Sequence, residues 1–65
     1  MFKLHDVVRL REPDKEFSIP THWDGVIVDI MRDGYYCVEF FDDNNETVMD
    51  ALLLRTYTDA DLVPA

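Results

Sequence analysis

The sequence predicts a small all-β domain built from five short strands. Residues 25 to 41 are dense in Val, Ile, Tyr and Phe, the residue types that favour strands. An Asp-Gly pair and an Asn-Asn pair interrupt the apolar runs, as expected for tight hairpins. A chain of 65 residues forms one domain, and so short a chain buries only about 60% of the surface that its unfolded form exposes. We therefore expect a single, marginally stable domain over residues 1–65.

The first strand is expected in LHDVVRLR, residues 4 to 11, where Val7, Val8 and Leu10 favour β-structure. The next segment, EPDKEFSIPTHWD, contains Pro13 and Pro20, which exclude a central strand or a helix interior. We expect this segment to form a long first loop.

The second and third strands are expected over residues 25 to 31 and 35 to 41 as a hairpin. Alternation along the second strand predicts three inward residues, Val26, Val28 and Ile30. A three-residue loop, Arg32 to Gly34 with Gly34 in the left-handed conformation, would pair them with Val38 and its inward neighbours Tyr36 and Phe40. A two-residue loop would place Asp29 opposite Val38, so the longer loop is preferred.

The fourth strand is expected over residues 47 to 54, TVMDALLL, after an Asn44-Asn45 turn. This register pairs three residues of the fourth strand with the inward face of the third: Met49, Ala51 and Leu53. A shift by one residue would bury Asp50 opposite Val38. The run ALLLR at residues 51 to 55 could instead be helical.

The last strand is expected at Leu62-Val63, where Pro64 ends it. Thr58 and Asp59 signal a turn before it, with one 3-10 turn. Five strands with a long first loop, two tight hairpins and this final turn predict an SH3-like barrel, whose closure removes exposed strand edges.

Four segments resemble a bacterial family of very small uncharacterised proteins, a domain of unknown function. They are KLHDVVRL, DGVIVDI, YYCVEFF with NNETVMDALL, and DADLVPA, and in order they cover nearly the whole chain. The resemblance implies an SH3-like fold and brings no catalytic residues. Family members often have mobile or toxin-like genetic neighbours, and this context is compatible with an antitoxin or immunity role. The chain departs from the family pattern in EPDKEFSIPTHWDG, where Trp23 precedes the glycine strand.

The acidic charge argues against a nucleic-acid partner. The formal net charge is −8, from 14 acidic and 6 basic side chains. Nucleic-acid binding requires Lys or Arg to neutralise phosphates. The charge keeps the chain soluble, and it also suits a basic protein partner.

We expect a cytoplasmic protein. Cys37 is the only cysteine, so no disulfide can form within the chain, and an unpaired thiol suits a reducing compartment. The start, MFKLHDVV, carries charge at Lys3 and Asp6 before any apolar run, unlike a signal peptide. No stretch is long enough to span a membrane.

We expect neither a catalytic site nor a metal or cofactor site. His5, His22 and Cys37 lack the close pairing in sequence that zinc sites show. The run DDNNE lacks the glycine and the distal glutamate of a calcium loop, so it is interpreted as a solvated turn. No nucleophile with a basic partner and no Gly-rich phosphate loop is present, so an enzyme is not expected.

A possible ligand groove is formed by Phe17, Trp23 and Tyr57, as in domains that bind proline-rich peptides on aromatic ridges. Alternatively, Trp23 caps the barrel. Such a groove, lined by aromatic and acidic residues, would favour cationic ligands.

The outer face of strands two to four is the strongest candidate for an interface. Its expected residues are mostly apolar: Ile27, Met31, Tyr35, Cys37, Glu39, Phe41, Val48, Asp50, Leu52 and Leu54. Exposed apolar patches of this kind usually mark interaction sites. Glu39 would face Asp50, and a basic group of a partner would relieve this repulsion. The face could be covered by the loop of residues 12 to 23, through Phe17, Ile19 and Trp23, but a partner is favoured. A homo-oligomer is the first choice, and a basic toxin or a cationic ligand are the alternatives.

Overall fold

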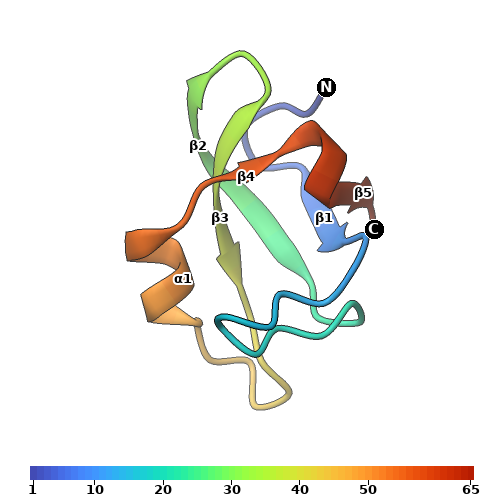
Figure 1. Ribbon diagram of the computed structural model, residues 1–65, viewed down its shortest axis with the longest axis vertical. Helices are drawn as coiled ribbons and strands as arrows, with labels where there is room; N and C mark the ends of the chain where they lie inside the picture. Colours follow the sequence, from blue (N-terminus) through green and yellow to red (C-terminus); the bar gives the residue numbers. More distant parts are fainter.

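The computed structural model describes residues 1–65 and consists mostly of strands (Figure 1). One five-stranded antiparallel sheet has the order β4-β3-β2-β1-β5. In chain order the elements are β1 (Val7–Leu10), β2 (Gly25–Arg32), β3 (Tyr35–Phe40), α1 (Met49–Leu54), β4 (Tyr57–Thr58), the 3-10 turn η1 (Asp59–Asp61) and β5 (Leu62–Pro64). This confirms the predicted all-β class and SH3-like barrel, with its long first loop and its 3-10 turn before the last strand.

The core draws on every element except η1, and on the first loop as well. Ten hydrophobic residues are buried: Val8, Leu10, Ile19, Ile27, Tyr36, Val38, Phe40, Ala51, Tyr57 and Leu62. The rings of Phe40 and Tyr57 meet edge to face, with centroids 5.3 Å apart. Because these residues come from both halves of the chain, the domain has one core that no single segment could form alone.

The inward face of β3 is as predicted, but that of β2 is wrong, because Val26 is only partly buried and Val28 and Ile30 are exposed. Ile30 pairs with Tyr36 as expected. The register then shifts between Ile27 and Asp29, so that Ile27 lies opposite Val38. A β-bulge adds a residue to one strand, and the side chains beyond it change faces. Ile27 is therefore fully buried, and its predicted place on the outer face is wrong.

The turn between β2 and β3 has two residues, Asp33 and Gly34, because Arg32 pairs with Tyr35. The prediction of a left-handed Gly34 is confirmed by its φ of 77°, but the predicted three-residue loop is wrong. A second register shift, between Ile30 and Arg32, leaves Met31 unpaired, so Ile30 still pairs with Tyr36 although the turn is one residue shorter.

The predicted fourth strand is wrong, because residues 49 to 54 form the helix α1. Ala, Leu and Met favour helices, and the segment has no β-branched residue after Val48. The predicted two-residue Asn44-Asn45 turn is also wrong: the Asp42 amide donates to the Glu46 carbonyl and Phe41 bridges to Thr47, so the loop has three residues, Asp43 to Asn45, with Asn45 at a φ of 61°. β3 pairs instead with β4, so the predicted pairing with Met49, Ala51 and Leu53 is absent.

The first loop folds across the end of the barrel below β1 and β2 in Figure 1. Two backbone hydrogen bonds of 2.9 Å join Asp14 and Ile19, which closes a narrow turn within the loop. Ile19 enters the core, and Phe17 packs against its edge. The loop therefore contributes to the core instead of spreading over the outer face through Ile19.

Candidate functional site

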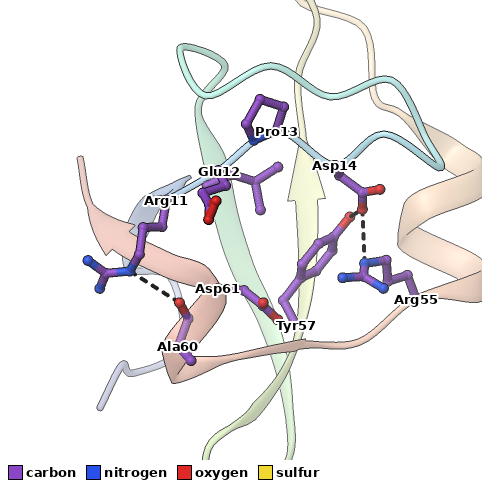
Figure 2. A pocket seen from close by; sticks show the side chains of 9 residues that line it. Arg11, Glu12, Pro13, Asp14, Arg55, Tyr57, Ala60 and Asp61 are labelled. Carbon is purple, nitrogen blue, oxygen red and sulfur yellow. Dashed lines mark hydrogen bonds and ion pairs between the residues drawn. The ribbon is translucent and has the colours of Figure 1, made fainter.

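The most enclosed hollow of the surface lies between the first loop and the chain around η1 (Figure 2). It measures about 140 Å³. Charged groups of both signs line it: Arg11, Glu12, Asp14, Arg55 and Asp61. Charged groups of both signs in one pocket could indicate a reactive site. Whether they can react depends on which of them are already held by hydrogen bonds and ion pairs within the chain.

Asp14 is the buried centre of this pocket, with a side chain only 5% exposed. One carboxylate oxygen accepts hydrogen bonds from the backbone amides of Glu16 and Phe17, at 3.0 and 3.2 Å. The other accepts a 2.8 Å hydrogen bond from the Tyr57 hydroxyl and lies 2.9 Å from Arg55 Nε. The Arg55 N–H is not aligned with any acceptor, so this last contact is an ion pair. Both oxygens of Asp14 are thus engaged, and Figure 2 shows the contacts with Tyr57 and Arg55.

Tyr57 serves as a hydrogen-bond donor at neutral pH. Burial raises the pKa of its hydroxyl far above the ordinary value, and the hydrogen bond to Asp14 with its negative charge raises the pKa further. The Arg55 guanidinium, 4.8 Å from the ring centroid of Tyr57, only partly offsets this. A phenol held protonated in this way cannot act as a general base near pH 7.

The remaining arginine of the pocket is also engaged. Arg11 donates hydrogen bonds to the backbone oxygens of Ala60 and Leu62, at 3.2 and 3.4 Å. The pocket therefore fastens the first loop to β4 and to the chain around η1. Asp14, Tyr57, Arg55 and Arg11 are thus engaged within the chain and act as a structural anchor.

The three residues of the predicted ligand groove do not line one surface, because Tyr57 is fully buried and Trp23 lines a different hollow from Phe17. Tyr57 is buried beneath Asp14, and Phe17 lies in a hollow with Val48 and Met49 beside the start of α1. Trp23 lies elsewhere, where its indole N–H donates a 3.0 Å hydrogen bond to Asp43.

The residues of the predicted interface also lie on separate parts of the structure. The segment with Val48, Asp50, Leu52 and Leu54 belongs to α1 and its N-terminal flank, so it shares no sheet face with β2 and β3. Glu39 does not pair with Asp50 across strands, and it accepts a 2.7 Å hydrogen bond from the Thr47 hydroxyl. Near the β2–β3 turn, Met31 Sδ lies 3.5 Å from Cys37 Sγ, and Tyr35 lies beneath the Arg32 guanidinium.

The β2–β3 hairpin exposes four apolar side chains, and we call this set the hairpin patch. It consists of Val28, Ile30, Met31 and Tyr35, which are 38% to 57% exposed. The sequence indicated Met31 and Tyr35 but placed Val28 and Ile30 inward. No sequence signal marks the two bulges that change the path of β2.

A second surface lies beyond the opposite end of β3, and we call it the outer groove. It measures about 380 Å³. Its apolar floor is made by Val7, Trp23, Val26 and Phe41, and its acidic rim by Asp24, Asp42 and Asp43. Val7 pairs with Val26, and the Phe41 amide donates to the Asp24 carbonyl, so pairing between β1, β2 and the end of β3 builds the groove. The sequence indicated Trp23 and Phe41 separately, and only the fold brings them together.

Two further findings concern metal binding and membranes. No group of three or more His, Cys, Asp and Glu side chains lies close enough to hold a metal ion. None of the helices has the length and apolar character that crossing a membrane requires.

The structure is thus a small all-β domain of SH3-like topology that exposes apolar side chains at the hairpin patch and in the outer groove. No protein-family model matches the chain, and neither a curated protein nor a solved structure matches it.

Proposed function

We propose that this chain is a non-catalytic protein-interaction module that forms a homodimer through the hairpin patch. The observation that supports the proposal is the exposure of Val28, Ile30, Met31 and Tyr35 on one projecting hairpin. Burying a large apolar side chain fully contributes about 1.5 to 3 kcal/mol. A domain of 65 residues gains a large fraction of its own stability by covering several of them.

The charges around the patch are compatible with a second copy. Asp29 and Arg32 lie on the same exposed stretch of β2 and carry opposite signs. A two-fold axis would bring the Asp29 end of one copy toward the Arg32 end of the other. With Asp33 in the turn, the hairpin from Val28 to Tyr35 has one basic and two acidic side chains, which oppose self-association less than the net charge of −8 suggests.

Side chains, and not strand addition, would form the contact. Beyond Ile27, β2 pairs only with β3, so one edge of β2 is open there. Two register shifts interrupt this edge, and bulges of this kind disfavour pairing with another strand. A symmetric contact of apolar side chains suits this geometry better.

Light scattering coupled to size-exclusion chromatography tests the proposal at tens of micromolar protein. We expect the wild-type chain to show twice its mass of 7.7 kDa, and Met31→Asp to show the single mass. Leu54→Asp is the matched control, because Leu54 is 75% exposed on α1, and this variant should remain dimeric. A strictly monomeric wild type would refute the proposal. Equal dissociation by both variants would show that the hairpin patch is not the interface.

The proposal includes a cytoplasmic location, since the free thiol of Cys37 is stable in a reducing compartment. We also propose that the chain belongs to the bacterial family of small proteins that its sequence resembles. The SH3-like fold is the one that this resemblance implies.

A further inference from the structure

We propose that the outer groove binds a lysine or arginine side chain of a basic partner protein. The groove lies near the end of β3 remote from the hairpin patch, so this site is separate from the proposed dimer contact. The inference rests on the apolar floor, the acidic rim and the charge around them.

The floor suits the aliphatic part of a long basic side chain. Val7 is 47% exposed, and Trp23, Val26 and Phe41 are each partly exposed. Lys and Arg side chains bury their methylene groups on apolar surface while the charged head remains at a polar edge. Trp23 adds an indole ring, which is the side chain that attracts cations most strongly through its π face.

The rim provides carboxylate oxygens that the chain does not use. Asp43 accepts the Trp23 indole N–H through Oδ1, and Asp24 meets Arg9 Nε through Oδ1 at 2.8 Å. The contacts that hold these two carboxylates all involve Oδ1. Their Oδ2 atoms are therefore free to accept hydrogen bonds from an incoming cation.

Asp42 is similarly oriented by the turn that follows β3. Its Oδ1 accepts the backbone amides of Asn44 and Glu46, at 2.9 and 3.0 Å. These bonds fix the position of one rim carboxylate before any ligand arrives, which lowers the entropy cost of binding. The rim is thus in place in the free protein.

The charge around the groove selects the occupant. Within the rim Asp24 is paired with Arg9 and Asp43 lies 3.5 Å from His22 Nε2, and the chain as a whole carries −8. A nucleic acid or an acidic protein would be repelled. A second copy would bring another −8 to this surface, whereas a basic partner would gain from the attraction during both approach and binding.

Trp23 is the only tryptophan, so its fluorescence reports directly on the groove. The probe is an acetylated, amidated Lys-Gly-Lys-Gly-Lys peptide, with the Glu-Gly-Glu-Gly-Glu peptide as control, at physiological ionic strength. We expect a saturable change with the lysine peptide and none with the glutamate peptide. No saturable change with the lysine peptide would overturn the inference.

Asp43→Asn removes a rim charge but keeps an oxygen that can accept the Trp23 N–H. It should weaken binding about fivefold, the effect of losing one partly exposed ion pair. Asp50→Asn is the matched control, because this exposed acid lies on α1 outside the groove and its loss changes the net charge equally. Equal weakening by both variants would show non-specific attraction and overturn the site.

The titration is repeated on Met31→Asp, which carries an intact groove. Binding to this variant should match that of the wild type, whether the wild type is a dimer or a monomer. The expected peptide binding therefore does not depend on whether the dimer proposal is correct. Loss of peptide binding on Met31→Asp, with its circular dichroism unchanged, would place the ligand at the hairpin patch and refute the assignment.

Discussion

Tyr57→Phe tests whether the hydroxyl of Tyr57 fastens the first loop to the barrel. The substitution keeps the buried ring and removes only the 2.8 Å hydrogen bond to Asp14. A hydrogen bond to a charged group contributes about 1.5 to 3 kcal/mol. Asp14 retains two backbone amides and Arg55, so we expect a loss in the lower part of this range, about 1.5 to 2 kcal/mol.

This loss is large for so small a domain. At typical values per residue, a chain of 65 residues has a free energy of unfolding of about 3 to 10 kcal/mol. Urea unfolding followed by circular dichroism has a slope of about 1 kcal/mol per molar for small proteins. The urea midpoint should therefore fall by about 1.5 to 2 M.

Tyr35→Phe is the control, because Tyr35 is 38% exposed and its hydroxyl forms no hydrogen bond within the chain. It should change the free energy of unfolding by less than about 0.5 kcal/mol. In an Asp14→Asn background, the effect of Tyr57→Phe should shrink, since the acceptor has lost its charge. If Tyr57→Phe has no more effect than Tyr35→Phe, the hydroxyl does not stabilise the loop and the reasoning fails.

Two further predictions concern the core. Burial raises the pKa values of Tyr36 and Tyr57 above the ordinary value of about 10, so the folded form holds both protons more tightly than the unfolded form. The free energy of unfolding should therefore be insensitive to these groups below pH 10 and should fall as the pH rises further. Ultraviolet absorbance should show that both tyrosines ionise together with unfolding. Ionisation of either tyrosine while the fold is intact would contradict this. Gly25→Ala should cost about 1 to 3 kcal/mol, because a Cβ would lie 2.7 Å from Val38 Cγ1. An unchanged urea midpoint would contradict this, because it would show that β2 and β3 can move apart to accept the added methyl group without a loss of stability.

The sequence predicts most accurately where alternation is uninterrupted. The inward residues of β3 are Tyr36, Val38 and Phe40 in both prediction and structure, because no bulge lies on that strand. Along β2 the same rule fails at Ile27, since a bulge depends on the strain and twist of the finished sheet more than on local residue preferences.

The helix α1 shows a second limit of sequence reasoning. Its residues suit either a half-buried strand or a short helix, and short apolar runs do not decide between them. Tertiary contact decides here: β4 occupies the edge of β3 and Ala51 enters the core, which leaves Leu53 and Leu54 exposed.

The candidate surfaces were only partly predictable for the same reason. Trp23 and Phe41 are recognisable in the sequence as aromatic residues near acids, but 18 positions separate them. The return of the first loop to the sheet brings them into one groove. The expectation of a single outer face failed because it depended on a fourth strand that is a helix.

The two buried tyrosine hydroxyls also affect how fast the chain can fold. Tyr57 reaches across 43 positions to Asp14, and Tyr36 joins Phe2, 34 positions before it, to Asp59, 23 positions after it. Contacts between such distant positions require large loops to close before they stabilise anything, and barrels of this topology typically fold in milliseconds to seconds. During that interval the apolar residues of both hairpin strands are open to solvent, so crowded conditions favour aggregation of the nascent chain over that of the finished domain.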